Sequence, residues 1–385
     1  MNQDLTKGPI IKSMLLFAVP MILGNLLQQC YNIADTFIVG RFLGSNALAA
    51  VGSSFTLMTF LTSILLGLCM GSGAYFSICF GERNEKALKE GLFASFLLIA
   101  GLTVILNVIV FALLDKIEFF LQVPKEVWPL MRSYLVIIFM GITATFFYNY
   151  FASLLRAVGN SIVPLVFLAV SAMLNIILDL WFVIGLNFGF GGTVMAAFAA
   201  AVKIDAFAYM PVQDFGNAFS TFIAQNYGAK KYDRIRSGFK GAMAASFFFC
   251  IIVSAIVWIF ARPLMLLFVD SSETAIIFEG VRYLHIEGAF YCGIGCLFLL
   301  YGLYRAMGKP EMSVVLTVIS LGTRVVLAYI LSAIPAISVV GIWWAVPIGW
   351  FLADCTGIIF YLSKKRSCST KAVSLFMLLQ SSHPH

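Results

Sequence analysis

The motif RAVG at residues 156–159 returns 149 residues later as RAMG at residues 305–308, and this repetition decides the fold. Each copy follows a long apolar segment. A second pair of stretches, 47–91 and 194–238, aligns at a constant offset of 147 residues and superimposes two alanines and two glycines. Two matched motifs, in the same order and at nearly the same offset, indicate an internal duplication.

The composition of the chain is that of a membrane protein. Of its 385 residues, 61% are hydrophobic and 11% are charged, and the mean hydropathy is +0.96. A soluble domain is nearer half apolar and about a quarter charged, so lipid must surround most of this chain. The net charge of +7 comes from Lys and Arg between apolar segments, which favours membrane orientation over nucleic-acid binding.

Apolar segments of about 20 residues or more, long enough to cross a bilayer, recur along the chain. We expect an all-α polytopic fold with ten membrane-spanning helices, near residues 13–42, 47–80, 88–113, 128–153, 161–185, 194–226, 239–262, 277–303, 311–332 and 338–362. The tail beyond residue 366 is weakly polar, and we expect it to fray.

Basic residues set the orientation of these helices. Most Lys and Arg lie at the two ends of the chain or in alternate loops, at residues 81–89, 156–160, 228–240 and 305–311. The positive-inside rule then places both termini in the cytoplasm. We expect a multi-pass protein of a bacterial inner membrane.

The two repeats run in the same membrane direction, which predicts a pseudo-two-fold axis along the membrane normal. We divide the chain into an N-terminal bundle (1–190), a C-terminal bundle (191–366) and a tail (367–385). The helix at 13–42 has no counterpart before the second repeat, and the helix at 338–362 has none after the first. Two helices are therefore missing where the repeats join, so each bundle keeps five.

Several motifs in order resemble the multidrug and toxic compound extrusion (MATE) family, in the branch typified by MepA and DinF. They are PMILGNLLQQCYNIAD (20–35), RAVGN (156–160), NIILD (175–179), VKIDAFAYMP (202–211), QNYGAKK (225–231) and RAMGKP (305–310). The resemblance implies twelve helices in two bundles of six, arranged as a V around a cleft. This chain lacks the sixth and seventh of them.

Acidic residues deep in apolar helices are the first candidates for function. Even on lenient insertion scales, a carboxylate at mid-membrane costs about 2.5–3.5 kcal/mol. Asp35 and Asp179 lie in such positions, and Asn175 is one turn before Asp179. Their oxygens suit Na⁺ or a shared proton, and the resemblance makes them the cation site of the N-terminal bundle. The alternative is that Asp35 lies near the outer interface and Asp179 caps its helix.

A second group of residues supports or parallels that site. Pro20 interrupts the first helix and permits a bend, while Gln28 and Tyr31 lie within two turns of Asp35. In the second repeat, the polar candidates are Lys203, Asp205 and Asp214. A structural ion network is the alternative for Lys203 and Asp205.

The function implied by the resemblance is antiport: entry of Na⁺ or H⁺ drives export of cationic, amphipathic drugs by alternating access. We expect no enzyme activity, no cofactor, no metal beyond Na⁺ at Asp35, Asn175 and Asp179, and no nucleic-acid partner. Lipid and small organic cations are the expected partners of a monomer. Two alternatives stay open: a flippase for lipid-linked oligosaccharides, and a truncated membrane protein that does not transport.

Overall fold

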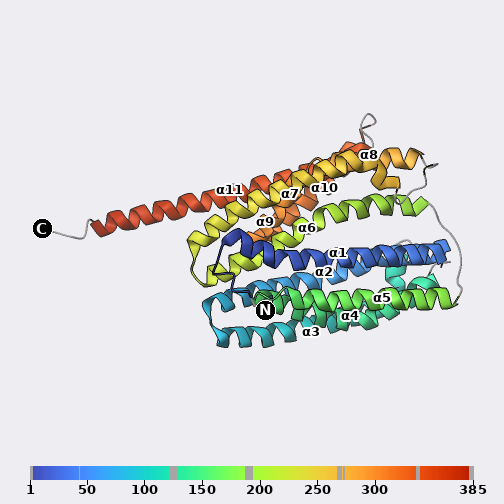
Figure 1. The fold of residues 1–385 in the computed structure, drawn as a ribbon, viewed down its shortest axis with the longest axis horizontal. Helices are drawn as coiled ribbons and strands as arrows, with labels where there is room; N and C mark the ends of the chain where they lie inside the picture. The colour runs from blue at the N-terminus through green and yellow to red at the C-terminus, as the bar shows by residue number, and fades with distance from the viewer. Residues whose placement is uncertain are drawn as a thin grey trace.

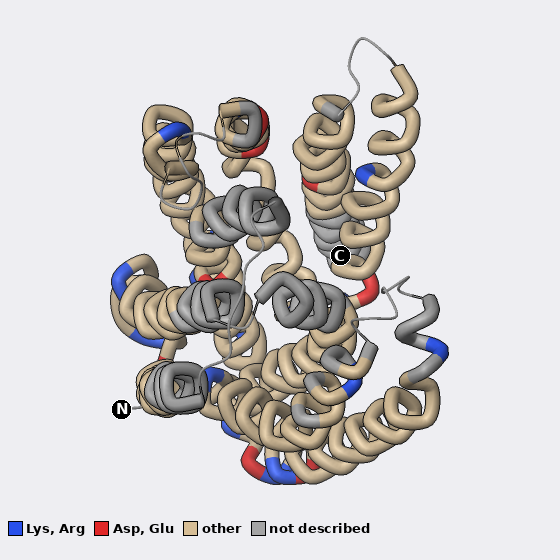
Figure 2. Tube along the Cα trace, turned by 90° about the vertical axis from the view of Figure 1, so that its right-hand side faces the viewer, with Lys and Arg blue, Asp and Glu red and all other residues tan. Residues whose placement is uncertain are grey.

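A computed structural model describes residues 3–42, 44–120, 128–186, 194–266, 271, 274–334 and 339–380. These residues form eleven helices (Figure 1). They are α1 (Ile10–Phe42), α2 (Gly44–Glu82), α3 (Glu85–Phe120), α4 (Trp128–Ala157), α5 (Ile162–Leu186), α6 (Val194–Gly228), α7 (Tyr232–Leu266), α8 (Thr274–Gly288), α9 (Tyr291–Ala306), α10 (Pro310–Ser332) and α11 (Val339–Gln380). Most run roughly parallel and are seen end-on in Figure 2.

The helices have the length and polarity needed to cross a bilayer. Within the described residues, seven are long and apolar enough by themselves, and the pair α8–α9 passes the same test together. The fold class expected from the sequence, an all-α polytopic membrane protein, is therefore confirmed. Nine of the predicted helices correspond to single helices of the structure.

The predicted helix at 277–303 is wrong as a single element, because the chain bends by 50° between α8 and α9. Gly288 ends α8, and the turn that follows is closed by a bond from the Phe290 N–H to the Glu287 carbonyl at 3.0 Å. Glycine is a poor helix former, so the break falls where the helix is weakest. The expected frayed tail is also corrected, since α11 continues beyond Ser367 to Gln380.

Three buried apolar clusters hold the helices together. One lies within the first repeat, among α2, α3 and α4, and a second lies within the second repeat, among α6 to α11. The third joins the repeats, because side chains of α1 pack there against α6, α7 and α9. The halves are thus joined by the packing of α1 on the second repeat and by the contact of α2 with α6.

The backbone repeats as the sequence does. Arg83 follows α2 and Lys230 follows α6, and both have φ of 57°. Gly159 and Gly308, the last residues of the two RAxG motifs, have φ of 84° and 70°. In each pair, a residue in the left-handed conformation follows the helix at the equivalent position of both repeats. The duplication is therefore preserved in the geometry of these loops.

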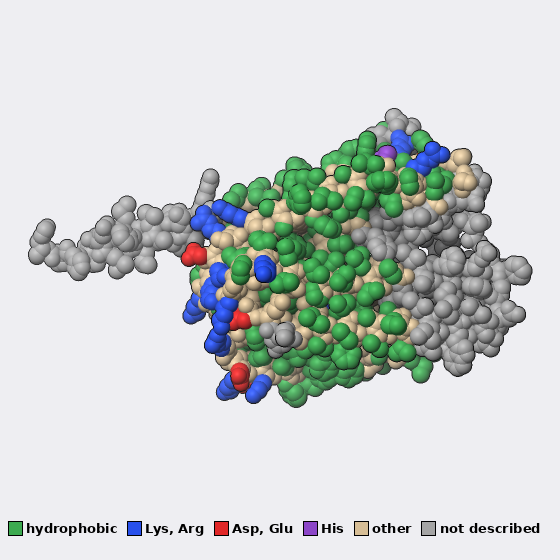
Figure 3. All heavy atoms as spheres, viewed as in Figure 1, with side chains coloured by type: hydrophobic (Ala, Val, Ile, Leu, Met, Phe, Trp, Pro, Cys, Tyr) green, Lys and Arg blue, Asp and Glu red, His purple; other side chains and the backbone are tan. Residues whose placement is uncertain are grey.

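Most of the Lys and Arg visible in Figure 3 gather at one end of the bundle, which we call the basic end, and a smaller group lies toward the opposite end. The basic end contains the turns after α2, α4, α6 and α9 and the segment before α1. The loops that the sequence analysis assigned to one side of the membrane therefore meet at one end of the structure.

Candidate functional site at the interface between the halves

Helices α2 and α6 cross at the basic end with their backbones in direct contact. A Cβ atom added to Gly81 would overlap the carbonyl oxygen of Gln225. One added to Gly228 would overlap the carbonyl oxygen of Ile78. The two contacts are equivalent by the repeat. Gly228 lies 147 residues after Gly81, and Gln225 lies 147 residues after Ile78. The pseudo-two-fold axis therefore passes through this crossing, and its contact is self-complementary.

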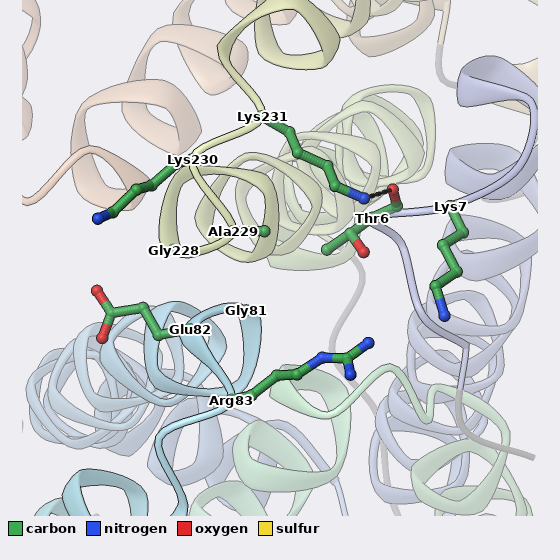
Figure 4. A pocket seen from close by; sticks show the side chains of 9 residues that line it. All are labelled: Thr6, Lys7, Gly81, Glu82, Arg83, Gly228, Ala229, Lys230 and Lys231. Carbon is green, nitrogen blue, oxygen red and sulfur yellow. Dashed lines mark hydrogen bonds between the residues drawn. The ribbon is translucent and has the colours of Figure 1, made fainter.

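A pocket of about 310 Å³ opens beside the crossing (Figure 4). Its lining is symmetric in part, since it includes Gly81 and Arg83 from one repeat with Gly228 and Lys230 from the other. In Figure 4 the Lys231 side chain reaches across to the backbone of Thr6. The pocket is therefore bounded by both halves and by the segment before α1.

That segment, residues 3–9, forms an N-terminal strap across the basic end. The backbone N–H of Gln3 donates to the Gly159 carbonyl at 2.9 Å. Leu5 is fully buried, and its N–H donates to Gln225 Oε1 at 3.1 Å. The Gln225 amide in turn donates to a carbonyl of the RAVG motif at 2.9 Å. One side chain of the second repeat thus ties the strap to the first.

Three side chains near the turn after α6 secure the strap by its carbonyl groups. Asn226 donates to the Leu5 carbonyl at 3.2 Å, and Lys231 to the Thr6 carbonyl at 2.8 Å. Arg234 donates to three strap carbonyls at 2.9–3.3 Å. Because cationic donors make the stronger hydrogen bonds, the contacts of Lys231 and Arg234 fix the strap more firmly than a neutral donor such as Asn226 does.

The strap also organises itself around Asp4. Burial raises the pKa of this carboxyl, but hydrogen bonds from Thr6 and the charge of Lys7 outweigh burial and hold the pKa below its usual value. The Thr6 hydroxyl donates to Asp4 Oδ1 at 2.6 Å, and the Lys7 ammonium lies 3.3 Å from Oδ2. The ionised Asp4 carboxylate therefore holds the strap in shape through contacts with Thr6 and Lys7 inside the strap itself.

A buried carboxylate lies deeper in the same interface. Asp214 on α6 is 2% exposed, and its Oδ1 accepts a bond from Asn25 Nδ2 on α1 at 2.5 Å. Its Oδ2 has no hydrogen-bond partner among the described side chains. Asp214 precedes the end of α6 by 14 residues, which at the helical rise corresponds to about 21 Å. The carboxylate therefore lies well inside the bundle, between helices from both halves.

An arginine of the second motif also bridges the halves. Arg305 Nη2 donates to Asn217 Oδ1 at 3.2 Å, and Nη1 lies 3.7 Å from Met70 Sδ. Asn217 follows Met70 by the repeat offset of 147 residues, so one guanidinium contacts equivalent positions of α2 and α6. Arg305 thus lies at the pseudo-symmetry axis, between α2 and α6.

The predicted N-terminal cation site falls largely outside the described side chains. Asp35 lies on α1 and Asn175 and Asp179 on α5, two helices that pack against each other, but the side chains of all three are outside the description, as is that of Tyr31. Gln28 is partly buried on α1. These roles stay predictions.

The remaining sequence candidates have different outcomes. Pro20 lies inside α1, which continues as one helix through it, so a bend there also stays a prediction. The side chains of Lys203 and Asp205, on α6, lie outside the description. The structure places Asp214 alone of the predicted residues in a fully described polar contact between the halves.

Sequence reasoning did not identify Asn25, Asn217 or the strap. Asn25 lies within the quoted stretch PMILGNLLQQCYNIAD, five residues after Pro20. A polar amide inside an apolar helix was the available signal, since such groups in membranes seek partners on neighbouring helices. Gln225 lies in the quoted QNYGAKK motif, but only the fold shows that it faces the strap.

Comparison with known proteins places the chain in a family. The MatE family model matches it twice, at residues 20–181 and 178–330. The chain therefore belongs to the MatE family of multidrug efflux transporters and is a multi-pass membrane protein. The double match agrees with the duplication read from the RAVG and RAMG motifs.

Among its relatives is the probable multidrug resistance protein YpnP of Bacillus subtilis, 25% identical over 97% of this chain and 98% of that protein. The multidrug export protein MepA of Staphylococcus aureus is 29% identical over 49% of this chain and 42% of its own length. The alignment with YpnP runs over 447 residues, more than this whole chain contains. The alignment must therefore leave gaps in this chain.

Solved structures confirm the fold. An outward-facing multidrug resistance MATE transporter superimposes with a TM-score of 0.86 at 19% identity, covering 95% of this chain and 98% of that one. A transporter of the MOP superfamily from Pyrococcus furiosus superimposes with a TM-score of 0.83 at 19% identity, covering 94% and 97%. At this identity the likeness concerns the fold alone.

The glycine crossing generates a stability prediction. Gly81→Ala and Gly228→Ala should each lower the thermal unfolding midpoint in detergent, because the new methyl group forces two backbones apart. Overpacking of this kind costs about 1–3 kcal/mol. Gly101→Ala is the matched control, since nothing lies within 4 Å of its added Cβ. Equal midpoints for all three variants would show that α2 and α6 do not meet as described.

The hydrogen bond between Asn25 and Asp214 leads to a second stability prediction. Asn25→Leu should destabilise the protein, because it leaves a buried carboxylate without its partner at a cost of about 1–3 kcal/mol. Adding Asp214→Leu should recover much of the loss, since removing both polar groups is nearly neutral. Thermal unfolding of the two single variants and the double variant measures the coupling. Strictly additive effects would contradict a direct bond between these side chains.

Proposed function

We propose that this chain is a cation-coupled antiporter that exports cationic, amphipathic compounds by alternating access. The observation that carries the proposal is the crossing of α2 and α6, where two repeats meet through a self-complementary contact at one end of the bundle. Rigid halves that touch around such an axis can open at that end without repacking internally. Membership of the MatE family and the multidrug names of its relatives support the same function.

The proposed orientation places the basic end in the cytoplasm of a bacterial inner membrane, with both termini on that side. The gathering of Lys and Arg there supports it by the positive-inside rule. Because the halves touch at the basic end, the described conformation then corresponds to the outward-facing state. The likeness to an outward-facing transporter supports this assignment.

The proposed driving force is the entry of Na⁺ or H⁺ without any cofactor. The proposed binding groups for the coupling ion are Asp35, Asn175 and Asp179, which lie on the adjacent helices α1 and α5 of the first half. Each elementary charge that enters down 100 mV releases about 2.3 kcal/mol. We further propose that the transporter works as a monomer surrounded by lipid.

A second function is favoured by one observation: the chain is shorter than its alignment with YpnP. In this alternative the protein keeps the architecture of the family but does not transport. The two candidates agree on the fold and differ in a single measurable property, which is export.

The test is accumulation of a cationic dye such as ethidium in a bacterium that lacks its own efflux pumps. We expect the chain to lower dye accumulation and Asp35→Asn to abolish the effect, because the neutral amide cannot exchange a proton or balance Na⁺. Asp233→Asn is the matched control, since this exposed carboxylate lies at the basic end, in the first turn of α7.

Two outcomes would overturn parts of the proposal. If the wild-type chain is present in the membrane and leaves dye accumulation unchanged, the non-transporting alternative is correct. If Asp35→Asn exports as well as wild type, coupling does not depend on Asp35. A dependence of export on external Na⁺ or on pH would identify the coupling ion.

A further inference from the structure

A groove of about 590 Å³ lies on the first repeat between α2 and α3. Its floor and walls are formed by Gly71, Ser72, Tyr75, Phe76, Glu90, Gly91, Ala94, Ser95 and Leu98. These positions lie within about four turns of the basic end. They belong neither to the glycine crossing nor to the predicted cation site.

The second repeat shows what such a groove is built to hold. The equivalent groove lies between α6 and α7, and α1 occupies it. Met14, Phe17, Ala18 and Met21 of α1 share one buried cluster with side chains of this second groove. The members that correspond to lining residues of the first groove are Ala218, Phe219, Phe222, Ile223 and Ala242, each at the repeat offset of 147.

The correspondence holds in atomic detail. A Cβ added to Gly91 would overlap the ring of Tyr75, and one added to Gly238 would overlap the ring of Phe222. Both pairs are related by the same offset, so the two grooves have the same construction. They differ in what covers them, because Tyr75 is 47% exposed whereas Phe222 is fully buried.

Other positions show the same difference. A Cβ added to Gly71 has nothing within 4 Å, while its counterpart Ala218 is fully buried. Ala94 is exposed, while a Cβ added to its counterpart Gly241 would overlap Ile11 of α1. The groove between α2 and α3 is therefore an α1-type docking site without its helix.

We infer that the groove between α2 and α3 binds a single membrane-spanning helix supplied by another polypeptide. The repeat fixes the direction of this helix, which runs parallel to α1 from the basic end. It also fixes the chemistry of the docked face, which carries large Met and Phe side chains beside a small Ala, as the buried face of α1 does. The small residues of the groove permit close approach of such a helix.

The packing of α1 within its own chain favours a helix of another polypeptide over α1 of a second copy. α1 packs against α5 as well as against α6, and Gly24 of α1 faces Leu165 and Leu168 of α5. The counterpart of α5 is α10, where Val314 takes the place of Leu165 and is 62% exposed. The helix of a second copy that would fit the groove is α1, and it already packs against α5 and α6 of its own chain.

The inference does not rest on transport, so its test measures binding. The probe is a synthetic peptide of residues 1–32 carrying Ile11→Cys and Cys30→Ser, added to the full chain in lipid vesicles. The chain carries Cys30→Ser and Ala94→Cys, because Ile11 meets the counterpart of Ala94 in the occupied groove. Mild oxidation should then give a disulfide-linked adduct of chain and peptide.

The matched control is Phe93→Cys, which moves the thiol to an adjacent residue that is 69% exposed but outside the groove. We expect loss of the adduct there. Gly71→Trp fills the groove and should also abolish the adduct at Ala94→Cys. Gly101→Trp should not, since its added side chain enters open space away from the groove.

Three results would overturn the inference. Equal adducts at positions 93 and 94 would mean that the peptide meets the lipid-facing surface at random and that lipid fills the groove. Disulfide-linked dimers of the Ala94→Cys chain without peptide would assign the groove to a second copy. An absent adduct, with thermal unfolding of the Ala94→Cys chain unchanged from wild type, would mean that the groove does not admit a helix.

Discussion

The approach of Gly81 and Gly228 to opposing backbone carbonyls is the contact on which the rest of the interface depends. Without a Cβ on either residue, α2 and α6 touch main chain to main chain. This closeness brings the turns after the two helices together, and it places Gln225 where it can bond the strap on one side and the RAVG motif on the other. Any side chain at either glycine would separate all of these groups at once.

The strap adds a second, asymmetric layer to a symmetric crossing. It covers Gly159, whose added Cβ would overlap the Gln3 carbonyl, whereas Gly308 has open space around the same position. Among the described residues, no counterpart of the strap or of α1 lies between α5 and α6. The strap therefore bonds to both repeats, but it covers only the RAVG motif and leaves the RAMG motif open.

Apolar length and loop charge were enough to predict most of the fold. Helix bounds followed from runs that exceed the bilayer thickness, and the shared end followed from the placement of Lys and Arg. The bend between α8 and α9 was not predicted, because both arms are apolar and hydropathy does not register direction. The continuation of α11 was missed because polarity was taken as a sign of fraying.

Single residues of the candidate site could be predicted from the sequence, but the contacts between them could not. Asp214 was identifiable as a carboxylate in an apolar helix, but its partner Asn25 is 189 residues away along the chain. Sequence spacing identifies neighbours within a helix and leaves contacts between helices undetermined. Arg305 was quoted as part of a motif, and only packing shows that it bridges Met70 and Asn217.

A duplicated protein contains its own reference state, because each surface of one repeat has a counterpart in the other. Where two equivalent positions differ in exposure, a neighbouring segment covers one of them and not the other. Tyr75 against Phe222, and Gly308 against Gly159, differ in the same sense and at the same end of the molecule. One cause accounts for both: in the part of the chain that the structure describes, no helix equivalent to α1 and no strap lie between α5 and α6. The duplication that identified the fold thus also locates, within it, the place where the fold is incomplete.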